Sequence, residues 1–311
     1  MIYTITLNPA LDRTLWVEKI RSDDPNRIER EERYAGGKGI DVSRVLATLG
    51  IANRALGFVG GFEGEELEGR LLNEGISCDF IRISGDTRTN IIVNDQSTGN
   101  QISFSGKGPE IKPYELMQII HKVEKLEEPE VVIISGSLPP GIHAEIYRKI
   151  IEMTRTKGTW VILDTDGEAL KVGIQGFPDI IKPNIHELSR LLDVELSELD
   201  GIVTAAQEVR EKGVEIVLVS MGARGMLLVG GEEQYLASPP EVKVVNTIGA
   251  GDSAVAGFVY GLVGNKSLKD ALIFAVAAGT ATTLRPGTAL CQKDDFFKLI
   301  EQVKVKPIKK N

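Results

Sequence analysis

Residues 130–141 read EVVIISGSLPPG, and this stretch carries the pattern on which the fold depends. Its four consecutive β-branched residues predict a strand buried on both faces, and the glycine, serine and diproline after them predict a tight exit. The same pattern of a short apolar run with a polar or glycine-rich end recurs in TWVILDT (159–165), DIIKPN (179–184) and EIVLVSMG (215–222).

Amphipathic helical patterns at residues 143–158 and 204–213 lie between these runs. Short strands that alternate with helices predict right-handed βαβ units and a doubly wound, mostly parallel sheet. Hydrophobic residues make up 42% of the chain and aromatic residues only 5%, as expected for an aliphatic parallel sheet. Such sheets bind ligands outside the carboxyl ends of their strands, so we expect the chemistry at that edge.

Two segments break the alternation. Residues 13–34 and 87–105 are predicted to form strands with polar turns, the second a hairpin around residues 97–100. Because no helix alternates with them, we expect both to leave the main sheet and form a small β-sheet lid over the site.

Composition narrows the possible functions. The net charge of −8 argues against nucleic acid as the main partner. Cys78 and Cys291 cannot form a disulfide framework, and the three histidines have no metal-ligand spacing. Met1 leads directly into a predicted strand, and no apolar run reaches 18 residues. These features predict a soluble cytoplasmic protein.

The stretch NTIGAGDS (246–253) comes directly before a long apolar helical pattern. Backbone N–H groups at the start of a helix are unpaired, and the glycines allow an anion to approach them closely. Gly249, Ala250 and Gly251 are therefore a candidate anion hole. Asp252 would repel the anion, but it suits a base that takes a proton from a hydroxyl attacking a bound phosphate. The alternative is that Asp252 only caps the helix.

AGGKGIDVSRVLATLG (35–50) is a second glycine cluster that enters a helix. It is no Walker A loop, because Lys38 is followed by Gly39 rather than by Ser or Thr. We interpret it as a set of backbone and Lys38 contacts to a phosphorylated, polyhydroxylated ligand. A tight turn with an exposed lysine is the alternative.

IIKPNIHELSRLL (180–192) ends a strand and opens a helix whose first turn carries Asn184 and Glu187 on one face. An amide and a carboxylate at this spacing can hold waters of a hydrated Mg²⁺ ion beside nucleotide phosphates. The same spacing also fits a capping box, with Asn184 as N-cap and Glu187 at N3. SMGARG (220–225) predicts a turn between two apolar runs.

Together, TLNPALD (6–12), GGKGID (36–41), GSLPPG (136–141), KPNIHE (182–187), SMGARG and NTIGAGDS closely resemble the motifs of the PfkB family of ribokinase-like sugar kinases, in the family's order. The resemblance covers nearly the whole chain. It implies an α/β ribokinase-like three-layer fold with a mostly parallel central sheet, and one kinase domain over residues 1–311 with the two lid segments. It also implies ATP as phosphoryl donor, Mg²⁺, a monovalent cation and a homodimer joined through the lids.

The resemblance also assigns site residues. It implies that Asp252 is the catalytic base, that Gly249, Ala250 and Gly251 form the anion hole, and that Asn184 and Glu187 govern the metal. The nucleotide is expected at Lys182, Asn184, Ser220, Gly222, Gly225 and Thr247. The sugar is expected at Asp12, Gly36, Gly37, Lys38, Asp41, Arg88 and Ser137, with Arg27 reaching the neighbouring subunit's site.

Within the family, TLNPALD and GSLPPG are similar to the hexose-phosphate kinases. Residues 277–291 and 164–170 favour 6-phosphofructokinase, whereas Lys38 is more typical of 1-phosphofructokinase and tagatose-6-phosphate kinase. Asp41 departs from the family's usual Asn. We predict phosphorylation of fructose 6-phosphate to fructose 1,6-bisphosphate, with Lys38 and Arg88 gripping the existing phosphate. The alternatives are 1-phosphofructokinase, tagatose-6-phosphate kinase, a kinase of nucleosides or unphosphorylated sugars, and a non-catalytic sugar-phosphate sensor.

Overall fold

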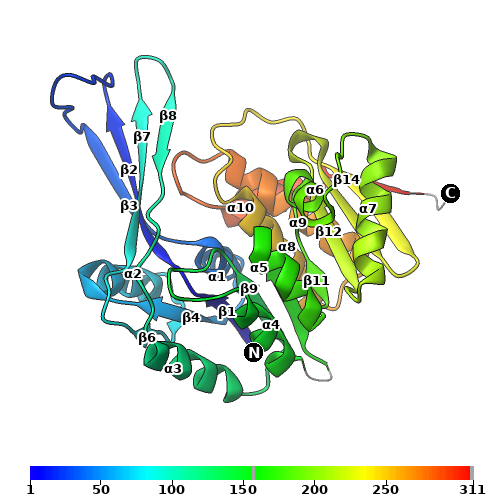
Figure 1. The fold of residues 1–311 in the computed structure, drawn as a ribbon. Helices are drawn as coiled ribbons and strands as arrows, with labels where there is room; N and C mark the ends of the chain where they lie inside the picture. Colours follow the sequence, from blue (N-terminus) through cyan, green and yellow to red (C-terminus); the bar gives the residue numbers. More distant parts are fainter. Residues whose placement is uncertain (156–157, 309–311) are drawn as a thin grey trace.

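The computed structural model describes residues 1–155 and 158–308 (Figure 1). Its main sheet is parallel from β12 to β5 and antiparallel from β12 to β15, so the prediction of a mostly parallel sheet is confirmed. The spatial order is β15 (Lys304–Pro307), β14 (Glu233–Ser238), β13 (Met226–Gly230), β12 (Ile216–Ser220), β11 (Ile180–Ile181), β10 (Trp160–Asp164), β9 (Val131–Ser135), β1 (Ile2–Thr6), β4 (Asn53–Val59) and β5 (Ser77–Cys78), with β6 (Ile81–Arg82) also paired to β4.

Helices cover both faces of this sheet. In β9, Val131 and Ile133 belong to one apolar cluster and Val132 and Ile134 to the other, as the two-residue period of a strand buried on both faces requires. The cluster that contains Val131 and Ile133 is completed by side chains from α1 (Lys38–Thr48), α8 (Ala250–Val263), α9 (Leu268–Thr283) and α10 (Lys293–Ile300). The cluster that contains Val132 and Ile134 is completed by side chains from α3 (Pro113–Glu124), α4 (Glu145–Thr154), α5 (Gly167–Gly173), α6 (Ile185–Leu192) and α7 (Leu199–Glu211).

The predicted strands and helices are largely confirmed. The helix predicted over residues 143–158 is α4, which ends at Thr154, and residues 156–157 of that prediction lie outside the described residues. The helix predicted over 204–213 lies within and just beyond α7. A further helix, α2 (Gly61–Asn73), packs against the small apolar cluster beside β4. None of the described helices is long and apolar enough to cross a membrane.

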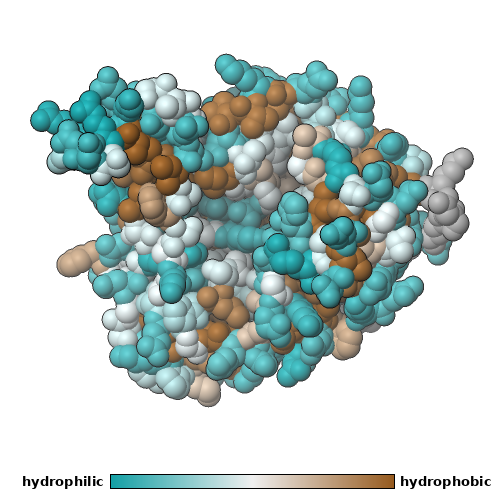
Figure 2. Space-filling view, turned by 45° about the horizontal axis from the view of Figure 1, so that its top comes forward, coloured by the Kyte–Doolittle hydropathy of each residue, from teal (hydrophilic) through white to brown (hydrophobic). Residues whose placement is uncertain are grey.

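A separate four-stranded sheet rises from the body at the upper left of Figure 1. Its order is β3 (Arg30–Gly36), β2 (Ala10–Val17), β7 (Arg88–Asp95) and β8 (Gln101–Phe104), which places the two segments predicted to leave the main sheet side by side. The β7–β8 turn closes where Asp95 N donates to Asn100 O at 2.9 Å. Figure 2 shows hydrophobic surface on this projecting sheet, where Phe104 is 57% exposed.

Candidate active site

The carboxyl ends of three neighbouring strands bring distant motifs to one edge of the main sheet. Asp164 ends β10, the Lys182–Asn184 segment follows β11, and Ser220 ends β12. The last two are tied together, because Ser220 N donates to Pro183 O at 3.0 Å and Asn184 bridges to Ser220. The edge predicted to carry the chemistry therefore carries these residues.

The start of α8 is open. Gly249 is its N-cap with φ 74°, and a Cβ there would overlap the Leu290 side chain, so both the backbone and the space require glycine. Ala250 N donates to Thr247 O at 3.3 Å, whereas the amides of Gly249 and Gly251 donate to no acceptor within the described part of the chain. One of the three amides predicted for the anion hole is thus already bonded, and two remain available.

Asp252 lies in the first turn of α8 without capping it. Across residues 1–155 and 158–308, no side chain caps this helix, so the interpretation of Asp252 as an N-cap is wrong. Burial raises the pKa of Asp252 to about 6, with Asp164 and Glu187 adding to the rise and two lysines opposing it. A carboxylate with this pKa is ionised at neutral pH and still accepts a proton readily, as a general base must.

The two lysines share one buried carboxylate. Lys38 Nζ lies 3.0 Å from Asp164 Oδ1, and Lys182 Nζ lies 3.4 Å from Asp164 Oδ2, with the Asp164 side chain fully buried. Burial raises the pKa of Asp164, but the two lysines outweigh it and hold that pKa below its ordinary value. Lys182 also lies beside α8, with Nζ 3.3 Å from where a Cβ on Gly251 would be. The sequence analysis missed Asp164, whose only signal was an acid at a strand end.

Lys38 needs a correction. Burial disfavours its charged form, but the carboxylates of Asp164, Asp252 and Glu187 together raise the pKa of Lys38 above its ordinary value. Its ammonium therefore lies in the centre that contains Asp252, and not at the far end of the sugar where we expected it to grip an existing phosphate. The alternative of an exposed lysine is also wrong, because this side chain is ion-paired and 33% exposed.

The start of α6 is closed by its own side chains. Glu187 N donates to Asn184 Oδ1 at 2.9 Å, and Asn184 N donates to Glu187 Oε2 at 2.7 Å, which completes the capping box. The second carboxylate oxygen of Glu187, Oε1, takes no part in the capping box and lies 3.9 Å from Lys38 Nζ.

These oxygens fit the coordination habits of Mg²⁺. The described residues contain no group of three or more His, Cys, Asp or Glu that could hold a metal alone. Mg²⁺ binds through one or two carboxylates and keeps several waters beside substrate phosphates. Glu187 Oε1 and the neighbouring Asp164 carboxylate are donors of that kind.

The sugar side of the site begins at Asp12 on β2. A Cβ on Gly36, in the neighbouring strand β3, would overlap the Asp12 carboxylate, so this glycine makes room for the acid. Asn90 Nδ2 donates to Asp12 Oδ1 at 2.8 Å. Burial raises the pKa of Asp12, while this hydrogen bond and the charges of Arg44 and Arg88 oppose the rise.

Arg88 and Ser137 are joined by Asn8. The Arg88 guanidinium donates to Asn8 O at 3.1 Å (Nε) and 2.9 Å (Nη2) and to Gly106 O at 2.8 Å, and Asn8 Nδ2 donates to Ser137 Oγ at 3.2 Å. Within the described residues, no carboxylate forms an ion pair with Arg88. Arg88 therefore has charge to offer a ligand. Asn8 was overlooked although it lies in the TLNPALD motif.

Asp41 is close enough to both Asp252 and Asp12 for their charges to act on it. Burial is the largest cause of the raised pKa of Asp41, and the charges of Asp252 and Asp12 raise it further. The charge of Arg88 lowers the pKa of Asp12. Asp41 is 5% exposed and lies in the first turn of α1. The N-cap of this helix is Gly37, which has φ 108°. Asp41 Oδ2 lies 3.9 Å from where a Cβ on Gly249 would be, so Asp41 lies beside the start of α8.

The remaining predicted residues lie around these charged groups. Arg27 lies in the exposed connection between β2 and β3, so within one chain it is at the lid and not in the catalytic centre. Gly222 opens η2 (Gly222–Arg224) in the β12–β13 turn, and Gly225 has φ 96° with no room for a Cβ against the Ala237 carbonyl. Thr247 is exposed beside the start of α8.

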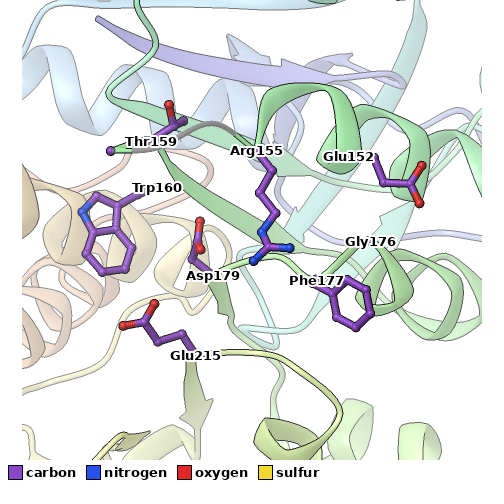
Figure 3. A pocket seen from close by; sticks show the side chains of 9 residues that line it. Glu152, Arg155, Thr159, Trp160, Gly176, Phe177, Asp179 and Glu215 are labelled. Carbon is purple, nitrogen blue, oxygen red and sulfur yellow. The ribbon is translucent and has the colours of Figure 1, made fainter.

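A cavity of about 670 Å³ lies at the opposite edge of the sheet (Figure 3). Its walls include Trp160 at the start of β10, and Asp179 and Glu215 immediately before β11 and β12. The amino ends of the strands form this edge, so the cavity is separate from the site described above.

The chain is similar to known proteins over nearly its whole length. The pattern of the pfkB family carbohydrate kinase matches residues 5–295. The chain is 36% identical over 305 residues to the 1-phosphofructokinase of Bacillus subtilis (strain 168), covering 98% of this chain and 99% of that protein. It is 37% identical over 300 residues to the ATP-dependent 6-phosphofructokinase isozyme 2 of Escherichia coli (strain K12), covering 96% and 97%.

Solved structures give the same relationship. The structure of phosphofructokinase-2 from Escherichia coli in complex with potassium superimposes with a TM-score of 0.93 at 36% identity, covering 97% of this chain and 98% of that chain. The same protein in complex with fructose-6-phosphate superimposes with a TM-score of 0.91 at 35% identity and the same coverage.

Proposed function

This chain belongs to the pfkB family of carbohydrate kinases and is an ATP-dependent sugar-phosphate kinase, and we propose that its substrate is fructose 6-phosphate. The transfer would place the γ-phosphoryl group of ATP on the primary hydroxyl at C1 and give fructose 1,6-bisphosphate. 1-Phosphofructokinase, which would give the same product from fructose 1-phosphate, is the second candidate, because one relative at 36% identity carries that activity in its name.

The observation that carries the catalytic assignment is the start of α8. Asp252, with a pKa raised to about 6 by burial, lies one residue after Gly251, whose amide is open. Asp252 takes the proton from the attacking hydroxyl, and the amides of Gly249 and Gly251 receive the phosphoryl oxygens. Preorganised donors of this kind stabilise the charge that develops on a transferring group. A sensor without turnover would have no need for this combination of base and open helix start.

Lys38 and Lys182 assist from the other side of the phosphoryl group. Both ammonium groups lie within 3.4 Å of Asp164, which holds them beside α8. A fixed pair of cations is suited to the negative charge of the nucleotide's phosphates. Lys182 therefore acts at the phosphate end of the nucleotide. The turn that contains Ser220, Gly222 and Gly225, together with Thr247, would accommodate the rest of the nucleotide.

Mg²⁺ would be held through Glu187 and Asp164, with Asn184 fixing the orientation of Glu187. When bound, it neutralises part of the phosphate charge and so favours nucleophilic attack. We also place a monovalent cation in the working enzyme, because one structural neighbour was solved in complex with potassium.

The placement of Asp252 at the start of α8 and of Arg88 on β7 of the small sheet favours a substrate with a primary hydroxyl at one end and a phosphate at the other. Asp252 meets the hydroxyl, and Arg88 with Ser137 meets the existing phosphate. Since Lys38 is paired with Asp164, it does not distinguish fructose 6-phosphate from fructose 1-phosphate or tagatose 6-phosphate. What still favours fructose 6-phosphate is the sequence of residues 164–170 and 277–291.

The substrate assignment is tested by kcat/KM for fructose 6-phosphate, fructose 1-phosphate, tagatose 6-phosphate and free fructose on one preparation. We expect the highest value for fructose 6-phosphate and a low value for free fructose, because a charge-assisted contact contributes about 1.5–3 kcal/mol. A preference for fructose 1-phosphate would overturn the assignment as a 6-phosphofructokinase but leave the proposed catalytic site unchanged. Equal use of free fructose would remove the phosphate role of Arg88.

The lid would form the interface of a homodimer. Ile28 in the β2–β3 connection and Ile102 and Phe104 on β8 are 50%, 41% and 57% exposed, so the small sheet offers apolar side chains that a second lid could cover. A second lid would cover them and bring Arg27 toward the neighbouring site. Light scattering on the wild type and on Phe104→Asp tests this: we expect a dimer and a shift toward monomer, and a monomeric wild type would contradict it.

A further inference from the structure

Tyr147 on α4 places a polar group deep in the core. The residue is 0% exposed, and among the described residues no fully buried side chain is larger. A hydroxyl that leaves water costs free energy unless it finds a hydrogen-bond partner. The Tyr147 hydroxyl donates to Gly136 O at 2.9 Å. Burial raises the pKa of Tyr147 above its ordinary value, so the hydroxyl keeps its proton and remains a donor.

Thr165 bonds the same carbonyl from the end of a neighbouring strand. It is 3% exposed, and its Oγ1 donates to Gly136 O at 2.8 Å. A carbonyl oxygen has two lone pairs and can accept from both hydroxyls. Leu163 in β10 packs into the apolar cluster that includes α4, and the two-residue period of a strand puts Thr165 on the same face. Asp164 lies between them and pairs with the lysines of the active site on the opposite face.

The two hydroxyls fix the direction of the peptide group between residues 136 and 137. A peptide group is planar and trans, so its C=O and the N–H of the next residue point in opposite directions. The Gly136 carbonyl points to the face that α4 covers, and the Ser137 N–H therefore points to the face that α1 covers. Lys38 of the active site lies there, with its Cβ 3.9 Å from where a Cβ on Gly136 would be.

The Ser137 N–H is open. Ser137 is exposed, and across residues 1–155 and 158–308 its N–H donates to no acceptor. A backbone donor that is exposed and directed at the lysines of a phosphoryl-transfer site is suited to an anionic oxygen of a ligand. The hydroxyls of Tyr147 and Thr165 are responsible for this direction, although both lie on the other side of the sheet.

Gly136 makes this direction easy to lose. Its φ is 102°, in the region that favours glycine, and a Cβ on it would meet nothing closer than 3.9 Å. Gly136 N donates to Asp164 O at 3.0 Å, which fixes the peptide group before Gly136 but not the one after it. Within the described part of the chain, Gly136 O accepts from the two hydroxyls and from no other donor. If this group turned over, its carbonyl oxygen would face the site and repel a phosphate.

We infer that Tyr147 and Thr165 are positioning residues, whose hydroxyls hold the Gly136 carbonyl behind the active site so that the Ser137 N–H donates to the existing phosphate of the substrate. This inference rests on the proposed function, in which Ser137 and Arg88 meet that phosphate. Neither Tyr147 nor Thr165 touches the substrate, because both act through one peptide group.

The inference is tested by removing the hydroxyls singly and together. Tyr147→Phe and Thr165→Val each keep the shape of the side chain, and the remaining hydroxyl still holds the carbonyl. Each single variant should therefore raise the KM for fructose 6-phosphate only slightly. In the double variant this KM should rise about 10-fold or more, as expected for the loss of one charge-assisted hydrogen bond. The rise should exceed the product of the two single effects, because the residues share one acceptor.

Two comparisons separate positioning from a general loss of stability. Tyr3→Phe is the matched control, because Tyr3 is 2% exposed and its hydroxyl donates to Glu127 O at 3.0 Å, at the amino end of β1. It should lower the thermal stability about as much as Tyr147→Phe and leave the KM for fructose 6-phosphate unchanged. The KM for ATP, and kcat/KM for free fructose, should change little in the double variant. A wild-type KM for fructose 6-phosphate in the double variant, or an equal loss with free fructose, would overturn the inference.

The direction of the peptide group can be observed without a substrate. Crystal structures should show the Gly136 carbonyl directed at α4 in the wild type and in Tyr3→Phe, and turned over or in two orientations in the double variant. An unchanged peptide group in the double variant would overturn the inference and leave the proposed function intact. If the wild type turned over no sugar phosphate, the proposed function and the phosphate contact would fail together, while the crystals would still decide whether the two hydroxyls hold this peptide group.

Discussion

Helices α6 and α8 both begin at the carboxyl edge of the main sheet, and both begin with residues that could be either caps or catalytic groups. In α6 the side chains of Asn184 and Glu187 bond the backbone of the first turn from both directions. In α8 the N-cap is Gly249, and the amides of Gly249 and Gly251 have no acceptor in the described part of the chain. A closed helix start stabilises itself, whereas an open one can stabilise an anion.

The difference assigns separate tasks to two similar acids. One carboxylate oxygen of Glu187 accepts a hydrogen bond from Asn184 N at the start of its own helix. The other lies 3.9 Å from Lys38 Nζ and is available to a metal. Asp252 makes no cap, and burial raises its pKa to about 6. The comparison therefore predicts that changes at α8 act on the chemical step, and that changes at α6 act on metal affinity and helix stability.

The largest effect is expected from Asp252→Asn, which keeps the size of the side chain but cannot accept a proton. General-base catalysis contributes about 10²–10⁴-fold, so kcat should fall by that factor with little change in KM. Asp270→Asn is the matched control, because Asp270 also lies in the first turn of its helix and is bonded to the Ser267 cap. Steady-state kinetics that found the two variants equally active would remove the distinction between the helices.

Gly249→Ala should come next. Its left-handed backbone and the contact with Leu290 leave no place for a methyl group, so the start of α8 must move. A displacement of 1 Å can cost about 10²-fold in rate, and we expect a fall in kcat of about 10-fold or more. Gly50→Ala controls for backbone strain, because Gly50 has φ 84° and open space around it. If both variants lost only stability, in thermal unfolding, the open helix start would have no catalytic role.

Glu187→Gln is expected to act on magnesium. Residues that orient a metal's surroundings typically contribute about 10–100-fold to affinity or activity, so half-maximal activity should require that much more Mg²⁺. Glu115→Gln is the control, because Glu115 closes a similar box at the start of α3 by accepting from Lys112 N at 2.8 Å. A magnesium titration in which Glu187→Gln overlays the wild type would make Glu187 a cap and nothing more.

Much of the fold follows from local patterns. The β-branched run at 131–134 identifies a strand buried on both faces, and the alternation of strands with helices identifies the parallel sheet and its functional edge. The two segments without helical partners were predicted to leave that sheet, and they form the small one.

The site was less predictable, because its contacts join segments far apart in the chain. Lys38 meets Asp164 across 126 residues, and Arg88 meets Asn8 across 80. No periodicity or spacing encodes such pairs. Whether Asp252 caps its helix depends on the φ of Gly249 and on which amides are already bonded, and the residue types alone are compatible with both answers.

The most direct test of the open helix start as the catalytic centre is the pH dependence of kcat/KM for the sugar phosphate, because this parameter reports the ionisation of the enzyme before the sugar phosphate binds. Asp252 must be ionised to act, and burial raises its pKa to about 6, so the wild-type kcat/KM should be flat at neutral pH and fall below that value. The limiting fall is about 10-fold per pH unit. The residual kcat/KM of Asp252→Asn should show no such fall. A wild-type kcat/KM that stayed constant well below pH 6, or an identical fall in Asp252→Asn, would contradict the assignment of Asp252 as the base.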